Sequence, residues 1–311
     1  IIVSYLYWRY WKMGSGRFKK SVRVDIQYSN ESTNCKLDVY LPNKKITSAP
    51  IIVFIYGGSW SSGSKLMYTT CANTLRDLGY VVVVPDYRKY PEGHSAGAHL
   101  ATQVVLSDVI EKVKYQENLM SGGSSPQMGI KHDPAEIKLG NEELTCKIQD
   151  FLPQVEGLLL FSGVYDIQSH LIHETNRGVE EISAMARAMG SCDEGYKINS
   201  PIFLMKENAS LLGKSEELLD LWPRVLIVHG QKDTTVGMEQ SSNMFNTIGK
   251  LLPVEHRKEV DVRMRLHKRM GHGEPVIDLM YNPFANKTLQ KLLLRDIQEF
   301  IDLPLSEDKI N

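Results

Sequence analysis

Cysteine is scarce in this sequence. Four cysteines occur among 311 residues, and they lie far apart at Cys35, Cys71, Cys146 and Cys192. No CxxC pair is present and no spacing fits a zinc site, so the pattern indicates neither a disulfide framework nor a structural metal. We expect the four side chains to be free, buried thiols.

An excess of charge of either sign is also missing. The chain carries 36 Lys and Arg against 37 Asp and Glu, a formal net charge of -1. This balance gives no electrostatic reason to expect nucleic acid or an anionic membrane surface as a partner. Hydrophobic residues make up 42% and charged residues 23% of the chain, which is ordinary for a globular protein with a large core.

The sequence lacks an apolar run that could cross a bilayer. Its most apolar and aromatic stretch, IIVSYLYWRYWKM at 1–13, is shorter than the roughly 20 residues that a spanning helix needs. It is either the end of a membrane anchor, because Trp, Tyr, Arg and Lys suit the interface, or a helix packed on the body. Since residue 1 is Ile, we expect the chain to be part of a longer protein. The compartment stays open between an endoplasmic reticulum or Golgi membrane and the cytoplasm, and so does the oligomeric state.

Short apolar runs alternate with helical patterns along the chain. This alternation predicts an α/β fold with a mostly parallel sheet covered by helices on both faces. The run IIVFIYGG at 51–58 is continuous and predicts a strand buried on both faces. Further strands are predicted at 35–42, 81–88, 155–163, 223–230 and 260–268, and helices at 67–80, 96–115 and 288–301.

One domain accounts for most of the chain. We place it at 22–303, between an apolar and basic flank at 1–21 and a tail at 304–311. Residues 116–153 contain SGGSSPQMG and few apolar runs, which indicates a surface insertion. Residues 166–222 are mostly helical in pattern and are predicted to form a cap.

The segment Gly93-His94-Ser95-Ala96-Gly97 matches the pattern G-x-S-x-G. A serine nucleophile on a strained turn needs small residues two positions away on either side, because the chain closes tightly there. A helix starts directly after it, so the Ala96 N–H can face a developing oxyanion. The bare pattern is common by chance and carries weight only with its context.

The segment YGGSW supplies part of that context. It follows a strand pattern, where a lipase-type oxyanion loop belongs, and its glycines let backbone N–H groups at Gly57, Gly58 and Ser59 approach a substrate. An ordinary Gly-Gly turn is the simpler alternative. A phosphate-binding loop is disfavoured, because Ser64-Lys65 follows Gly63 where Lys and then Ser or Thr would be needed.

An acid and a histidine complete the candidate site. Asp233 comes just after the strand pattern VLIVHG, where a carboxylate can orient a histidine, although it could equally cap the next helix. His272 lies in the glycine-flanked loop GHGEP. Nucleophile, acid and histidine in the order Ser95, Asp233, His272 along the chain is one of the orders known for serine hydrolases. His267 is the alternative base, but it falls within a strand pattern.

Together, YGGSW, PDYRKYPEG, GHSAGAHLA, LFSGVYD, VLIVHGQKDTTV and GHGEP resemble the α/β-hydrolase superfamily in its carboxylesterase branch, and most closely the isoprenylcysteine methylesterase group. The resemblance covers roughly 22–303. It implies that Ser95 is the nucleophile, His272 the base and Asp233 the residue that orients His272. It also implies oxyanion donors at Gly57, Gly58, Ser59 and Ala96, substrate contacts at Trp60 and Tyr165, and no cofactor or metal.

The same resemblance implies a substrate. The substrates proposed for that group are methyl esters of prenylated cysteine, and its members are often membrane-anchored, so a small-molecule or lipidated-cysteine ester is expected. Kynurenine formamidases share these motifs, which makes an arylformamidase acting on N-formylkynurenine the alternative enzyme. No residue in the sequence separates the two.

The chain departs from the family pattern before the nucleophile. Family members carry a helix and a strand there, whereas only seven positions separate Tyr87 from Ser95. A parallel crossover needs at least about 10–12 residues, so the nucleophile strand is predicted to be absent and its neighbours to have open edges. Tyr56 also replaces the usual His, which matters little if backbone N–H groups bind the oxyanion. A catalytically impaired isoform that acts as a binding module is therefore a further alternative.

Overall fold

The computed structural model describes residues 21–30, 32–33, 35–43, 48–60, 63–87, 96–120, 137–139, 142–144, 151–213, 221–252, 260–280 and 286–302. The flank at 1–20, Cys146, Ser95, the tail and most of the predicted insertion lie outside the described residues, and the predictions made for them stay predictions. Within the insertion only two short strands, β5 (Ile137–Leu139) and β6 (Glu142–Leu144), are described.

Four strands form the first sheet, in the order β1-β2-β4-β3. They are β1 (Val22–Gln27), β2 (Lys36–Tyr40), β3 (Ile51–Val53) and β4 (Val81–Pro85). β1, β2 and β4 pair antiparallel, and β3 pairs parallel with β4. The 3-10 turn η2 (Lys65–Tyr68) and helix α3 (Thr69–Asp77) lie between β3 and β4, because two parallel neighbours need a crossover connection.

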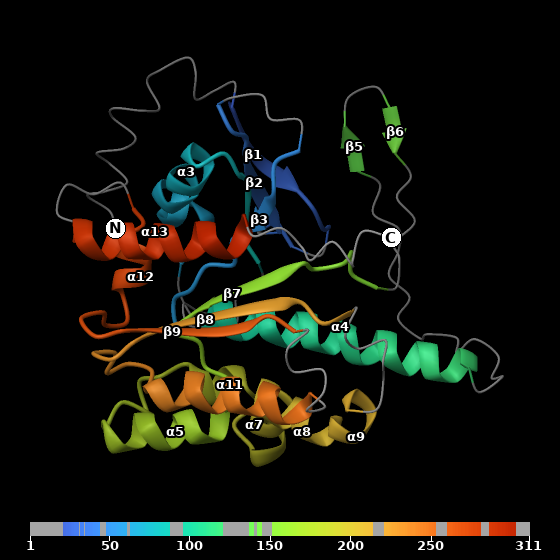
Figure 1. The fold of residues 1–311 in the computed structure, drawn as a ribbon, viewed down its shortest axis with the longest axis vertical. Helices are drawn as coiled ribbons and strands as arrows, with labels where there is room; N and C mark the ends of the chain where they lie inside the picture. Colours follow the sequence, from blue (N-terminus) through green and yellow to red (C-terminus); the bar gives the residue numbers. More distant parts are fainter. Residues whose placement is uncertain are drawn as a thin grey trace.

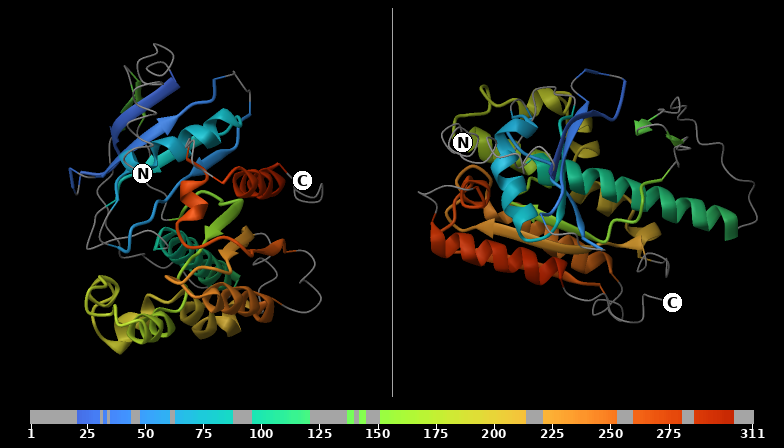
Figure 2. Two further views of the ribbon diagram at one scale, coloured as in Figure 1. Left: turned by 90° about the vertical axis from the view of Figure 1, so that its left-hand side faces the viewer. Right: turned by 90° about the horizontal axis from the view of Figure 1, so that it is seen from above.

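Three parallel strands form the second sheet, in the order β7-β8-β9. They are β7 (Gly157–Phe161), β8 (Arg224–Gly230) and β9 (Val262–His267). Figure 1 shows α4 (Ala96–Met120) and α11 (Met238–Leu251) on one side of this sheet and α13 (Lys287–Ile301) on the other, and Figure 2 shows the same layers from two more directions.

Strand β8 explains why both faces need a helical layer. Its side chains alternate: Val225 and Ile227 pack in the core with α4 and α11, whereas Leu226 and Val228 pack in the core with α13. The predicted helix at 96–115 is confirmed as the first part of α4, with Val105, Val109 and Val113 buried on one face. The predicted closing helix is confirmed as α13.

The segment between β7 and β8 is helical. It contains α5 (Ile167–Asn176), α6 (Met185–Ala188), α7 (Asp193–Ile198), α8 (Pro201–Glu207) and α9 (Ala209–Leu212). Its role as a cap over a substrate stays a prediction. Five of the described elements were not predicted from the sequence: β1, the short strands β5 and β6, α11 and the short helix α12 (Glu274–Ile277).

The prediction of a strand buried on both faces at 51–58 was wrong. β3 ends at Val53, and the side chains of Ile51 and Val53 are 69% and 58% exposed. Among the described residues β3 pairs only with β4, and β7 pairs only with β8. Among the strands that the structure describes, the parallel arrangement is therefore interrupted between β3 and β7, and none of them pairs with the second edge of β3.

One thiol also differs from expectation. Cys35 and Cys71 are free and buried, but Cys192 is exposed, because it caps the N-terminus of α7, where its sulfur accepts a hydrogen bond from Gly195 N at 3.4 Å. In the described part of the chain, no helix combines the length and apolarity that crossing a membrane requires.

Candidate active site

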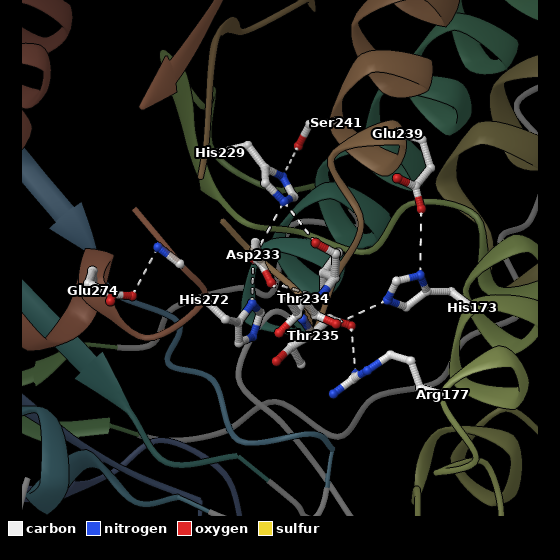
Figure 3. A network of polar contacts seen from close by, with 12 residues as sticks. His173, Arg177, His229, Asp233, Thr234, Thr235, Glu239, Ser241, His272 and Glu274 are labelled. Atoms are coloured by element: carbon white, nitrogen blue, oxygen red, sulfur yellow. Dashed lines mark hydrogen bonds and ion pairs between the residues drawn. The ribbon is translucent and has the colours of Figure 1, made fainter. Parts of the chain in front are cut away.

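Asp233 and His272 form the best-defined part of the site. Asp233 follows β8, and His272 lies between β9 and α12. Because β8 and β9 are parallel neighbours, their carboxyl ends meet at one edge of the sheet, which brings the two loops together. His272 Nδ1 lies 2.7 Å from Asp233 Oδ2, and Figure 3 shows this pair at the centre of a polar network.

Hydrogen-bond donors surround the Asp233 carboxylate. Its Oδ1 accepts from the backbone N–H groups of Thr235 and Val236, both at 2.9 Å. Its Oδ2 faces His272 Nδ1 and, at 3.4 Å, His229 Nε2. Burial alone would raise the pKa of Asp233, but the hydrogen bonds from the two histidines and the backbone hold that pKa below its usual value. The site therefore contains a permanent carboxylate that fixes the orientation of the His272 ring.

His267, the alternative base, points elsewhere. Its Nε2 lies 3.0 Å from Asp296 Oδ2 on α13. The imidazole is thus paired with a carboxylate on the helical layer that covers the opposite face of the sheet from α4.

The loop YGGSW at 56–60, which we call the oxyanion loop after its predicted role, follows β3 and has an unusual backbone. Gly58 has φ 150°, and the non-glycine residues Ser59 and Trp60 have φ 58° and 54°. Positive φ at non-glycine residues costs of order 1–3 kcal/mol each and persists only where the surroundings impose it. Such strain is concentrated at functional sites, which supports the prediction made for this loop.

Two tyrosine hydroxyls hold the oxyanion loop. Tyr68 donates to the carbonyl oxygen of Gly57 at 2.6 Å, and Tyr87 donates to that of Tyr56 at 2.6 Å. Tyr56 is stacked between both rings, with centroid separations of 5.1 and 4.9 Å. In a trans peptide the N–H points away from the C=O. Fixing the Gly57 carbonyl toward Tyr68 therefore turns the Gly58 N–H in the opposite direction.

The start of α4 lies against the oxyanion loop. A side chain at Gly97 would place its Cβ 2.4 Å from the Ile55 carbonyl oxygen, so only glycine allows this approach. A Cβ at Gly163, just after β7, would lie 2.9 Å from the Cβ of Ala98. The first turn of α4 therefore touches the segments that follow β3 and β7, two strands that each lie at the edge of their sheet among the described residues.

A small apolar cluster brings three motifs together. Trp60 of the oxyanion loop, Ala96 at the start of α4 and Val236, three residues after Asp233, belong to the same buried cluster. Trp60 also packs edge-on against the buried ring of His99 at 5.7 Å between ring centroids. Tyr165, predicted to contact substrate, is instead fully buried in the core cluster of α4, β8 and α11. Its role and that of Trp60 stay predictions, and Ser95 lies outside the described residues.

Two side chains of α5 that were not predicted as site residues contact the loop that follows Asp233. His173 Nε2 lies 3.2 Å from the Thr234 carbonyl oxygen, and Arg177 donates to the Thr235 carbonyl at 3.4 Å, as Figure 3 shows. His229 was also missed, although a histidine in an otherwise apolar strand four residues before Asp233 is a visible signal. Among the described residues no three His, Cys, Asp or Glu side chains are placed to hold a metal ion.

Comparison with known proteins agrees with the motifs. The family model BD-FAE matches residues 37–92. The isoprenylcysteine alpha-carbonyl methylesterase of Arabidopsis thaliana is 24% identical over 242 residues, which are 74% of this chain and 53% of that protein. The kynurenine formamidase of Danio rerio is 28% identical over 163 residues, 51% of this chain and 53% of that protein. The chain spans between about half and two thirds of the length of the methylesterases it matches.

Solved structures show the same fold at low sequence identity. Esterase B from Lactobacillus rhamnosis has a TM-score of 0.55 and 15% identity, with 93% of this chain and 91% of that chain covered. Carboxyl esterase 2 from Tuber melanosporum has a TM-score of 0.52 and 16% identity, with 88% and 86% covered. These matches confirm the fold class and the resemblance predicted from the motifs: the chain has the α/β-hydrolase fold and is similar in sequence to the isoprenylcysteine methylesterases.

Proposed function

We propose that the protein hydrolyses carboxylic esters through an acyl-serine intermediate on Ser95. The Ser95 oxygen attacks the ester carbonyl carbon while its proton passes to His272 Nε2. Collapse of the tetrahedral intermediate breaks the ester C–O bond, and the alcohol leaves with that proton. A water molecule then gives a proton to His272 while its oxygen attacks the acyl carbon. The bond between this carbon and the Ser95 oxygen breaks, Ser95 takes the proton back from His272, and the carboxylic acid is released.

The observation that supports this proposal best is the 2.7 Å contact between His272 Nδ1 and an Asp233 carboxylate that backbone N–H groups hold in place. A permanent carboxylate at Nδ1 keeps the proton there, so Nε2 is the nitrogen that can accept a proton. We assign the oxyanion to backbone N–H groups at Gly58, Ser59 and Ala96, with Gly57 in support. The tyrosine contacts on the carbonyls of the oxyanion loop favour this assignment.

Two substrate classes follow from the names of the relatives. We propose an ester of the prenylcysteine methyl ester type, because five matched proteins are isoprenylcysteine methylesterases or probable ones, with up to 88% of this chain covered. The alternative is hydrolysis of N-formylkynurenine, which the kynurenine formamidases favour over at most 51% of the chain.

A catalytically impaired isoform is the remaining alternative, and the interrupted sheet favours it. The strand before a nucleophile turn normally fixes the serine, and a displacement near 1 Å can cost about 10²-fold in rate. Opposing this, the first turn of α4 touches the segments that follow β3 and β7, which holds the start of that helix in place.

Covalent labelling tests the proposal. The chain and its Ser95→Ala variant would be treated with a fluorophosphonate and analysed by intact mass, with His272→Gln as a second comparison. One adduct on the chain, none on Ser95→Ala and much slower labelling of His272→Gln are expected. No adduct on folded protein would refute the proposal for this chain. If the protein reacts with the fluorophosphonate, its turnover of a prenylcysteine methyl ester is compared with its turnover of N-formylkynurenine, which distinguishes the two substrates.

A further inference from the structure

His229 lies directly behind the acid of the proposed triad. It is the last but one residue of β8, and its side chain is fully buried. Its Nδ1 lies 2.7 Å from Ser241 Oγ on α11, and its Nε2 lies 3.0 Å from the Val236 carbonyl oxygen and 3.4 Å from Asp233 Oδ2. Figure 3 shows the ring between Ser241 and Asp233, on the opposite side of the carboxylate from His272.

The partners of His229 determine which nitrogen carries its proton. Nε2 faces a carbonyl oxygen and a carboxylate oxygen, and both can only accept hydrogen bonds. A neutral imidazole therefore has its N–H at Nε2 and a lone pair at Nδ1. The Ser241 hydroxyl can donate to that lone pair, so both ring nitrogens are satisfied without a second proton.

This tautomer gives Asp233 Oδ2 one imidazole donor and places a second imidazole N–H close to it. His272 Nδ1 donates to Oδ2 at 2.7 Å, whereas the His229 N–H donates to the Val236 carbonyl at 3.0 Å and its nitrogen lies 3.4 Å from Oδ2. Two backbone N–H groups hold Oδ1, so N–H groups approach both oxygens of the carboxylate. The orientation of the carboxylate is fixed from both sides.

We propose that His229 is a positioning residue, which holds the Asp233 carboxylate against His272 Nδ1 and reduces the negative charge that Oδ2 presents to His272. This inference rests on the proposed function, because it assigns His229 a part in the same site. Ser241 acts one step further away by fixing the His229 tautomer.

The role proposed for His229 predicts in which direction the titration of His272 moves when the His229 donor is removed. Removing the His229 donor leaves more negative charge on Oδ2, which stabilises the protonated form of His272. The pH at which His272 is half protonated is then expected to rise. The other titratable or charged side chains described around this cluster include His170, His173 and Arg177 on α5, Glu239 on α11 and Glu274 on α12. All of them are the same in the wild type and in the His229 variants.

The experiment is an NMR titration of the histidine side chains in ¹⁵N-labelled protein, with the His272 signal assigned by its loss in His272→Gln. His229→Phe keeps the ring volume and removes the donor, so the His272 titration should move to higher pH. His229→Gln keeps an N–H donor near the Nε2 position and should titrate like the wild type. Identical His272 titrations in all three folded proteins, or equal shifts in both variants, would overturn the inference.

Two further measurements cover a His229→Phe variant that does not fold and test the role of Ser95 separately. If His229→Phe does not fold, Ser241→Ala replaces it. That variant frees the ring to turn, so a smaller shift in the same direction is expected and no shift overturns the inference. Fluorophosphonate labelling of the same samples tests Ser95 separately. A shifted titration without labelling would support the role of His229 while refuting the proposed esterase function.

Discussion

Stability should fall in mildly acidic solution because His99 is buried in its neutral form. The ring is 2% exposed, and its Nε2 lies 2.6 Å from the Asn199 carbonyl oxygen, so Nε2 carries the proton. Nδ1 is buried without a partner, and a proton added there would meet no acceptor. Burial, partly offset by the bond to Asn199, lowers the pKa of His99 to about 4, from about 6.5 in an unfolded chain.

The sign and size of the effect follow from linkage. Between pH 6.5 and pH 4 the unfolded chain binds a proton at His99 and the folded chain does not, so the unfolded state is favoured as the pH falls. The stability from His99 is fully present above pH 6.5 and is lost progressively below it. By pH 4.5 the loss is about 2.5 kcal/mol, since one pKa unit corresponds to about 1.4 kcal/mol. The depressed pKa of Asp233 acts in the same sense, but only below its unfolded value near 3.8.

The assay is urea unfolding of wild type and His99→Gln at several values from pH 7.5 to pH 4.5. Glutamine can still donate to the Asn199 carbonyl but does not titrate in this range. The free energy of unfolding of the variant should therefore fall about 2.5 kcal/mol less than that of the wild type over this interval. His170 is a second buried histidine with a pKa lowered to about 4, so part of the wild-type slope should persist in the variant. Equal slopes for the two proteins would refute the reasoning.

Other substitutions test the oxyanion loop, the start of α4 and the open edge of β3. Tyr68→Phe removes a buried donor and should lose about 1–3 kcal/mol of stability together with most fluorophosphonate labelling, whereas Tyr80→Phe, which loses only a bond to Asp302, should keep its labelling rate. Gly97→Ala should unfold more easily or fail to label, because its Cβ would meet backbone oxygen atoms. In Gly249→Ala the new Cβ meets nothing within 4 Å, so the free energy of unfolding should rise by up to about 1 kcal/mol through the higher helix propensity of alanine in α11. Thermal unfolding of both variants measures these changes. Val53→Lys should lower self-association in light scattering and change stability by less than about 0.5 kcal/mol; unchanged association would argue against an open edge.

Strong local signals carried the sequence prediction. Strand β8 and helices α4 and α13 have long periodic patterns, and they lie where the sequence places them. The pairing of Asp233 with His272 rather than His267 followed from motif order and loop position, and the geometry agrees with it. These features depend on residues that are near one another in the sequence or on a fixed order of motifs.

Features that depend on tertiary neighbours were not predictable in the same way. The run at 51–58 reads as a buried strand, yet β3 is short and exposed, and none of the described strands pairs with its second edge. The tyrosine contacts on the oxyanion loop join positions that are separated along the chain, and no local sequence pattern predicts them. His229 could have been found, since a fully buried histidine in an apolar strand requires partners for both nitrogens.

The interruption of the sheet explains why the helix start is the critical element of this site. In the described residues no strand joins β3 to β7, so ladder hydrogen bonds cannot set the spacing of the two sheets there. Contact through Gly97 and Ala98 sets it instead, together with a core in which β4 and β8 side chains pack with α13. Van der Waals contact is less directional than a ladder of hydrogen bonds, so this junction should open at lower free energy than the sheets beside it. Hydrogen exchange that is faster in the second turn of α4 (100–103), where the intrahelical hydrogen bonds begin, than in β8 would therefore accompany a weakened nucleophile. Protection equal to that of β8 would mean that packing alone holds the start of α4 in place.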